Sequence, residues 1–306
     1  MVERIALVSA REALALDEDM VPLVAALQAQ GAEVGTPSWD DAAVDWSGYD
    51  LAVLRSTWDY VDRIDEFLAW AERCAACTRL VNGPDVVRWN TDKHYLRDLA
   101  QAAVPIVPTR FAEPGSRASA ELVRFLDEWG CEEFVVKPAI GAGSRDAARH
   151  RRGDGGRAVA HLQALLDAGR SAMLQPYLAR VDEHGETAAI YLGGTYSHAI
   201  RKGPLLRVGD ELVAGLFAPE QITARMADAD ELRVAEAALS AIPFERPTYA
   251  RVDMIRDGGG GPVVLELELT EPSLFLAHAP GAAERYAAIL RQARPAAGSL
   301  PLRAGN

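Results

Sequence analysis

Cysteine is scarce in this chain of 306 residues, and long apolar runs are missing. The three cysteines are too few for a disulfide scaffold and suit a reducing compartment. Cys74 and Cys77 form a C-x-x-C pair, but no second pair follows, so we predict neither a zinc site nor a thioredoxin-like centre. Because no stretch of about 18 uncharged apolar residues occurs, we expect no transmembrane helix and no membrane partner.

Positive charge is also in the minority. Lysine and arginine number 32 against 44 aspartates and glutamates, which leaves a formal net charge of -12. A chain of this sign without a basic stripe is not expected to bind nucleic acid, although a local basic cluster could still hold a small anionic substrate. The N-terminus enters an apolar strand directly, so we expect no signal peptide and a cytoplasmic location, and we allow for a homodimer.

Two familiar phosphate-binding motifs are absent as well. The chain has no G-x-x-x-x-G-K-[ST] loop, and the run AIGAGSRDA does not complete G-x-G-x-x-G. Lys137 nevertheless ends an apolar strand and precedes a turn in which Gly141 and Gly143 let the backbone approach an anion and Ser144 adds a donor. Lys93, at the start of a helix, is a second candidate for phosphate. The alternative is an ordinary hairpin turn without a ligand.

Strand and helix patterns alternate in the first 88 residues. Apolar runs at 4–9, 32–39 and 49–56 predict strands, and helical spacing at 19–30 and 65–77 predicts helices between them. This order predicts βαβ units and a parallel sheet, and hence an α/β (α+β) fold class.

Ligands of parallel sheets collect beyond the carboxyl ends of the strands, which is where Arg55 and Ser56 stand. A guanidinium at that position suits a carboxylate. We therefore interpret Arg55 and Ser56, together with Ser273 far downstream, as substrate-binding residues. The alternative is that Arg55 pairs with Asp59 or Asp62 and only shapes the loop.

The rest of the chain divides into two further modules. Residues 89–172 carry two helix patterns, the strand that ends at Lys137, a return strand and another helix. Residues 173–306 begin with the strand AMLQPYL and contain several more strands and a final helix. With the N-terminal module at 1–88, the sequence predicts three parts.

The strongest local feature is the run VVLELEL. Side chains two apart on a strand share a face, so Glu266 and Glu268 are expected to point the same way, with three leucines opposite. Arg251 and Asp253 lie in another strand that could pair alongside. Three carboxylates from two strands are typical of a magnesium site completed by phosphate. The alternative is an amphipathic strand whose acidic face meets water.

These features occur in the order typical of the ATP-grasp superfamily, which the chain therefore resembles over nearly its whole length. The matching pieces are Asp92-Lys93, the VVKP run with its glycine-rich turn, MLQPY, Arg251-x-Asp253 and Glu266-x-Glu268. The resemblance implies an ATP-grasp fold preceded by the N-terminal α/β domain, with residues 89–172 as the lid and 173–306 as the subdomain of the metal site.

The resemblance also implies roles for individual residues. It implies that Lys93 and Lys137 bind the α- and β-phosphates under the flap Gly141–Ser144, and that ATP and Mg²⁺ or Mn²⁺ are cofactors. The last metal position is often asparagine in the superfamily, so Glu268 is a departure. The remaining implied roles are adenine recognition by Gln175, Pro176, Tyr177 and Leu178, ribose binding by Asp182, phosphoryl stabilisation by Arg251, γ-phosphate contacts by Arg201 and Lys202, and metal binding by Asp253, Glu266 and Glu268.

More narrowly, the stretches LRSTWDY, LELELTEPSLFL and GGTYSHAIRKGP resemble the cyclo-ligases that close O-ureido-D-serine to D-cycloserine. This resemblance implies that a substrate carboxylate becomes an acyl phosphate, which a nitrogen of the same amino-acid-like molecule attacks. ADP, phosphate, CO₂ and NH₃ would be released. Two alternatives are an ATP-grasp ligase that joins an amino acid to a separate amine, and an ATP-binding sensor without turnover.

Overall fold

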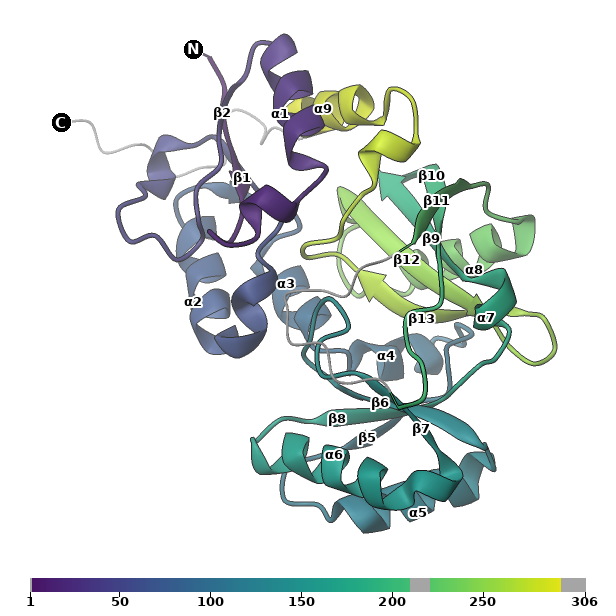
Figure 1. The fold of residues 1–306 in the computed structure, drawn as a ribbon. Coiled ribbons are helices and arrows are strands. Elements are labelled where there is room, and N and C mark those ends of the chain that lie inside the picture. Colours follow the sequence, from purple (N-terminus) through teal and green to yellow (C-terminus); the bar gives the residue numbers. More distant parts are fainter. Residues whose placement is uncertain (1, 210–220, 293–306) are drawn as a thin grey trace.

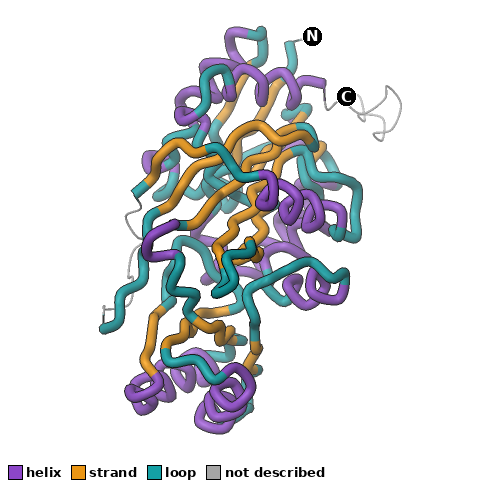
Figure 2. The backbone as a smooth tube through the Cα atoms, turned by 90° about the vertical axis from the view of Figure 1, so that its right-hand side faces the viewer, coloured by secondary structure: helices purple, strands orange, loops and turns teal. Residues whose placement is uncertain are grey.

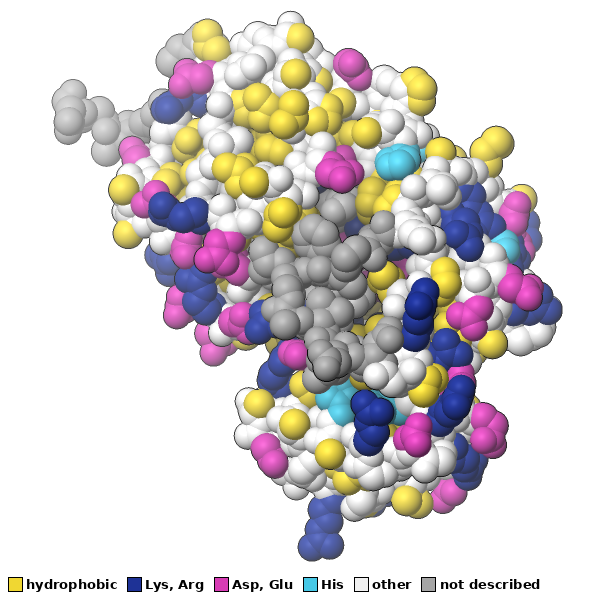
Figure 3. Space-filling model, in the orientation of Figure 1, with side chains coloured by type: hydrophobic (Ala, Val, Ile, Leu, Met, Phe, Trp, Pro, Cys, Tyr) yellow, Lys and Arg dark blue, Asp and Glu magenta, His cyan; other side chains and the backbone are white. Residues whose placement is uncertain are grey.

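The computed structural model describes residues 2–209 and 221–292, and three sheets organise them (Figure 1). Figure 2 shows strands in the middle of the molecule and helices at its two outer ends. On the visible face in Figure 3, basic and acidic side chains are interspersed. No helix among the described residues is long and apolar enough to cross a membrane.

The N-terminal sheet is parallel, as predicted, with the order β2-β1-β3-β4. Alternate residues of β1 face opposite cores: Ile5 and Leu7 pack with helix α1, whereas Ala6 and Val8 pack with helix α2. Strands covered on both faces need continuous apolar runs, which explains the sequence pattern. The elements are β1 (Arg4–Val8), α1 (Met20–Ala29), β2 (Glu33–Gly35), β3 (Leu51–Leu54), α2 (Ile64–Ala75) and β4 (Arg79–Leu80).

The small sheet is antiparallel and has the order β5-β8-β6-β7. Its helices α5 and α6 bury one face, where Phe134 and Val136 pack, and leave Val135 and Lys137 on the other. The predicted return strand is confirmed as β7. The elements are β5 (Arg110–Ala112), α5 (Ala118–Trp129), β6 (Glu133–Pro138), β7 (Ala148–Arg151), α6 (Gly155–Asp167) and β8 (Ala172–Pro176).

The central sheet is antiparallel with the order β11-β10-β9-β12-β13. Along β12, Val252 and Met254 pack in the core with α4 and α8, so Arg251 and Asp253 point to the opposite face. The elements are α3 (Pro84–Thr91), α4 (Tyr95–Gln101), α7 (Val181–His184), β9 (Glu186–Leu192), β10 (Thr195–Lys202), β11 (Ile222–Arg225), α8 (Ala229–Ser240), β12 (Tyr249–Arg256), β13 (Pro262–Glu268) and α9 (Ala282–Gln292).

Three boundaries differ from the predicted modules. Strand β8 pairs with β5 and β6, so it belongs to the small sheet rather than to the part that begins at residue 173. Helix α4 packs on the central sheet instead of the lid, since Leu96 and Leu99 contribute to its core. Helix α9 packs against α1 and completes the N-terminal core (Figure 1).

Candidate active site

A cavity of about 360 Å³ lies where the three parts of the chain meet. It has two sides, which we name by their residues. The hinge side is lined by Val107, Val135, Gln175, Leu178 and Ile255, and the loop side by Trp58, Tyr60, Glu271, Ser273 and Phe275.

The three predicted metal ligands line this cavity together. Strands β12 and β13 are antiparallel neighbours in which Asp253 is opposite Glu266 and Arg251 is opposite Glu268. The predicted pairing of the two acidic strands is therefore confirmed.

One detail of β13 was predicted wrongly. The register shifts after Asp253, so that Met254 pairs with Val264 and Leu265 is the extra residue of a β-bulge. Leu265 consequently lines the cavity beside Glu266, and only Leu267 and Leu269 lie in the core on the opposite face. The sequence suggested all three leucines on that face.

Cationic side chains separate the carboxylates. Lys93 Nζ lies 3.0 Å from Glu266 Oε1, and Lys202 Nζ lies 2.8 Å from Asp253 Oδ2 and 2.7 Å from Glu186 Oε1. Arg251 donates to Asp253 at 2.8 Å and also contacts Glu268. The carboxylates and the cationic side chains therefore form a buried network of ion pairs.

The pKa values of Glu266 and Glu268 reflect their burial and the charges of the neighbouring side chains. Burial opposes ionisation of Glu266, but Lys93 and Lys137 outweigh it and hold its pKa below the usual value. Burial raises the pKa of Glu268 to about 7, because Asp253 and Glu266 add repulsion that Arg251 does not cancel. An additional cation among these oxygens would relieve that repulsion.

The donor set fits a hard divalent metal. Three carboxylates from two paired strands line one cavity, and oxygen donors of this kind are what Mg²⁺ and Mn²⁺ prefer, although no choice of one oxygen from each brings all three within 4.8 Å of one another. Asp253, Glu266 and Glu268 are the residues that would hold it.

Lys137 is the cavity cation best suited to phosphate. The amine of Lys137 has no hydrogen-bond or ion-pair partner among the residues that the structure describes. Lys93, in contrast, donates to the carbonyl of Gly141 at 2.6 Å and pairs with Glu266. Burial lowers the pKa of Lys137, and an anion nearby would favour its charged form.

The turn after Lys137 lines the cavity through Gly141, Gly143 and Ser144. Gly143 and Ser144 both have left-handed backbone, with φ of 61° and 60°. Glycine adopts this conformation without a steric cost, which explains its use there.

The hinge side is mostly apolar. Val107, Ile255 and Leu178 form a small cluster with Leu265, which suits a flat aromatic ring. Gln175 is buried and donates to Thr109 Oγ1 at 2.8 Å.

Of the other residues predicted to bind adenine or ribose, Pro176 and Tyr177 also line the cavity. Asp182 does not; its carboxylate accepts a hydrogen bond from the hydroxyl of Tyr177. Ribose binding by Asp182 stays a prediction.

Arg55 and Ser56 lie outside the cavity lining and are completely buried. The guanidinium of Arg55 pairs with Asp19 at 3.1 Å and Asp17 at 3.4 Å, and it donates to the carbonyl of Pro272 at 3.1 Å. The alternative pairing with Asp59 or Asp62 is wrong, because those acids pair with Arg63 and Arg145. This environment favours a structural role over direct contact with substrate.

Glu271 is a cavity residue that the sequence motifs did not predict. Glu271 lines the cavity, its carboxyl is hydrogen-bonded to Tyr60, and its carbonyl accepts from Trp58 Nε1 at 3.1 Å. Burial raises the pKa of Glu271 to about 8. The sequence feature that could have indicated Glu271 is its position three residues after Glu268.

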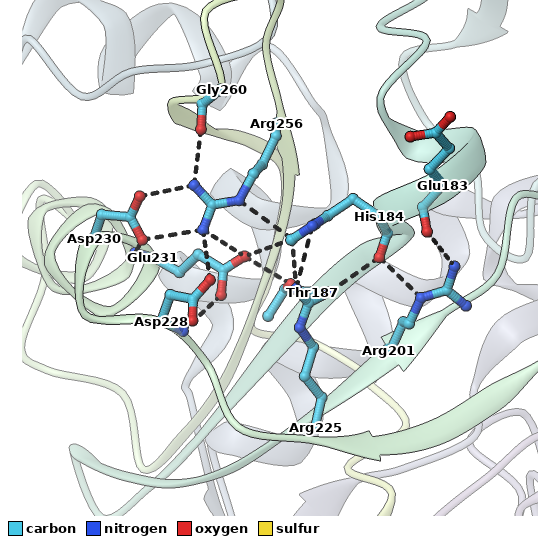
Figure 4. Close-up of polar contacts among 10 residues, drawn as sticks. All are labelled: Glu183, His184, Thr187, Arg201, Arg225, Asp228, Asp230, Glu231, Arg256 and Gly260. Atoms are coloured by element: carbon cyan, nitrogen blue, oxygen red, sulfur yellow. Dashed lines mark hydrogen bonds and ion pairs between the residues drawn. The ribbon is translucent and has the colours of Figure 1, made fainter.

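Arg201 does not line the cavity, unlike its neighbour Lys202. Figure 4 shows the Arg201 side chain directed at Glu183 and His184. It donates to the carbonyls of His184 at 2.8 Å and Glu183 at 3.0 Å, which end helix α7. A γ-phosphate contact by Arg201 is therefore not supported by the geometry.

The same close-up shows why His184, Asp228 and Glu231 are not a convincing metal site, although their ligand atoms lie within 4.8 Å of one another. Arg256 bonds Asp228 at 2.8 Å and lies 3.6 Å from Glu231, and Arg225 contacts His184. These acids are paired with arginines, and unlike the three predicted metal ligands the three residues do not line the cavity.

Comparison with known proteins agrees with this geometry. A "Cycloserine biosynthesis protein DcsG" from Streptomyces lavendulae is 41% identical over 294 residues, which are 94% of this chain and 98% of the relative. The chain belongs to the DcsG family. The model of the "D-cycloserine synthetase DcsG, N-terminal domain" matches residues 5–82. A crystal structure of D-cycloserine synthetase DcsG aligns with a TM-score of 0.89 at 41% identity, covering 94% of this chain and 99% of that one.

Distant structures share the fold of this DcsG family member. A RimK-domain ATP-grasp protein from Sphaerobacter thermophilus aligns with a TM-score of 0.66 at 18% identity, over 94% of this chain and 98% of that one. D-alanine–D-alanine ligase from Bacillus anthracis complexed with ATP gives 0.67 at 15%, over 95% and 97%. The predicted ATP-grasp fold is confirmed, and the chain is an ATP-dependent ligase.

Proposed function

We propose that this ligase closes O-ureido-D-serine to D-cycloserine. The observation that carries the proposal is the 41% identity to the DcsG relative over nearly both whole chains, together with a cavity lined by the carboxylates and cations of the motif. The name of that relative gives the product class, and the cavity offers the charges that the chemistry needs.

In the first step, the substrate carboxylate attacks the γ-phosphorus of ATP, and ADP leaves. Arg251, fixed by Asp253, is placed to stabilise the moving phosphoryl group, while Lys93 and Lys137 hold the remaining phosphates. Mg²⁺ or Mn²⁺, when bound, would offset charge on the phosphate oxygens.

In the second step, the nitrogen bonded to oxygen in the ureido group attacks the acyl phosphate. The new bond joins this nitrogen to the acyl carbon, the carbon–oxygen bond to phosphate breaks, and the nitrogen loses its proton. Water must be excluded here, because it would hydrolyse the acyl phosphate. The turn Gly141–Ser144, which lines the cavity, would cover the phosphates. Hydrolysis of the carbamoyl group by one water then releases CO₂ and NH₃.

The test is ADP release against a panel of amino acids with and without O-ureido-D-serine, combined with mass spectrometry of the product. We expect ADP release with O-ureido-D-serine alone and formation of D-cycloserine. A requirement for a separate amine would instead establish the intermolecular ligase. Nucleotide binding without ADP release for any substrate would favour the sensor, although the complete set Asp253, Glu266 and Glu268 argues against it.

A further inference from the structure

The segment 272–276 carries Ser273 and Phe275 into the loop side of the cavity, and the N-terminal domain holds it in place. Asp19 accepts hydrogen bonds from the backbone amides of Leu274 at 2.6 Å, Phe275 at 3.1 Å and Leu276 at 2.7 Å. A single carboxylate therefore satisfies three successive amides that come from about 255 residues further along the chain.

Arg55 completes this attachment. Its guanidinium binds Asp19 at 3.1 Å and, through the other amino group, the carbonyl of Pro272 at 3.1 Å. Ser273 is thus flanked by two residues whose backbone is bound by the Arg55–Asp19 pair. Both partners are almost completely buried, so water competes little for these bonds.

The backbone of Phe275 shows that the attachment imposes a shape. Phe275 has a φ of 51°, in the left-handed region that bulky residues rarely adopt. The surrounding structure must supply the free energy that keeps it there. The hydrogen bond from its amide to Asp19 is one such contribution.

The held segment contacts the phosphoryl arginine directly. Arg251 donates to the carbonyl of Ser273 at 3.0 Å, and its guanidinium lies 5.6 Å from the ring centre of Phe275. The same guanidinium binds Asp253 and Glu268. A displacement of Ser273 or Phe275 would therefore be transmitted to Arg251.

We propose that Asp19 is a positioning residue for phosphoryl transfer: with Arg55 it fixes segment 272–276, and that segment orients Arg251. This inference rests on the proposed function, because it assumes that Arg251 acts on the transferred phosphoryl group. It also gives Arg55 a role in the reaction without contact with substrate.

Asp17 provides a matched control for Asp19. Both acids are buried and contact Arg55, but Asp17 accepts from Arg55 and from the amide of Asp19 rather than from segment 272–276. Asp19→Asn and Asp17→Asn therefore remove the same charge beside the same arginine, but only Asp19 bonds the segment, and only Asp19 lines the cavity.

The experiment measures hydrogen exchange of the amides at 274–276, thermal stability, and kcat and KM for both substrates in the two variants. In Asp19→Asn we expect faster exchange at these amides and a kcat lowered about 10–100-fold, the range for residues that orient a catalytic group through one intermediate contact. KM for ATP should stay within about twofold, since the contacts of the hinge side are unchanged. In Asp17→Asn we expect slow exchange and kcat within about threefold of the wild type.

Slow exchange in Asp19→Asn, or fast exchange with unchanged kcat, would overturn the proposal, and so would an equal loss of kcat in both variants. If Asp19→Asn does not fold, Asp19→Glu keeps the charge beside Arg55 but displaces the oxygens, and a lowered kcat with retained melting temperature is then expected. A wild type that makes no D-cycloserine would refute the proposed function alone, because the variants can still be compared by exchange and by ADP release with the best substrate of the panel.

Discussion

The hinge side and the loop side of the cavity are assembled in different ways. The hinge side comes mainly from strands, in which β6, β8 and β12 present Val135, Gln175 and Ile255, while Val107 and Leu178 lie in adjoining loops. The loop side comes from segments that are distant in sequence and are held by hydrogen bonds between side chains and backbone. Examples are those from Trp58 Nε1 to the carbonyl of Glu271 and from the amide of Leu274 to the carboxylate of Asp19. A side built from strands is fixed by their ladders, whereas a side built from loops depends on individual buried polar residues. The two sides should therefore respond differently to substitution.

The carboxylates between the two sides should give the largest effect. In Glu268→Gln we expect turnover to fall by a hundredfold or more, roughly the loss seen when one preorganised charge is removed from a reacting centre. ATP affinity should fall much less, because Lys93 and Lys137 remain. The measurements are steady-state ADP release and ATP titration, with the exposed Glu183→Gln as a control. Normal turnover in Glu268→Gln would refute the metal assignment.

A substitution of Lys137 should affect the hinge side of the cavity but not the loop side. Removal of a charged hydrogen-bond donor costs about 1.5–3 kcal/mol, so Lys137→Met should raise KM for ATP about 10–100-fold. KM for the amino-acid substrate should change little, since Lys137 does not belong to the loop side. Two-substrate kinetics would show this split. An equal rise in both KM values would mean that the cavity has no such division.

Glu271 offers a test of the loop side through pH. Burial raises its pKa from the usual 4.5 to about 8, so the folded chain binds the proton more tightly than the unfolded chain does. The stabilisation is complete below about pH 4.5 and is lost as the pH rises through about 8, by a few kcal/mol at most. Metal-free wild type should accordingly lose more stability between pH 5 and pH 8 than Glu271→Gln, as measured by denaturant unfolding in EDTA at about these two values. If the stabilities of the wild type and Glu271→Gln changed equally with pH, the raised pKa of Glu271 would be contradicted.

The smallest effect is expected at the turn over the phosphates. Gly143→Ala places a side chain on left-handed backbone and should cost about 1–2 kcal/mol of stability. Turnover should slow as well, because the turn would approach phosphate less closely. Gly153→Ala is a suitable control, since Gly153 has no atom within 4 Å of an added Cβ. Equal melting temperatures and rates for the two variants would contradict the prediction.

Much of the fold and part of the site could be predicted from local sequence patterns. The parallel N-terminal sheet was apparent because its strands are buried on both faces, and the carboxylates were apparent because Glu266-x-Glu268 repeats with the period of a strand. A β-bulge has no such period, so the inward position of Leu265 could not be read from the sequence. The partners of Arg55 could not be predicted for another reason. Asp17 and Asp19 lie in a different loop, and only the tertiary structure brings them next to Arg55.

The contact between α9 and α1 has a consequence for dissecting the molecule. The core that contains Ile5 and Leu23 also contains Tyr286 and Leu290, so the two ends of the described chain share one apolar interior. A fragment covering residues 1–88 would expose the surface that α9 covers, and about 25 cal/mol is lost for each Å² of apolar surface returned to water. The N-terminal sheet is therefore a recognisable module but not an independent folding unit. Expressed alone, that fragment is expected to aggregate, and a supplied α9 peptide should restore its solubility.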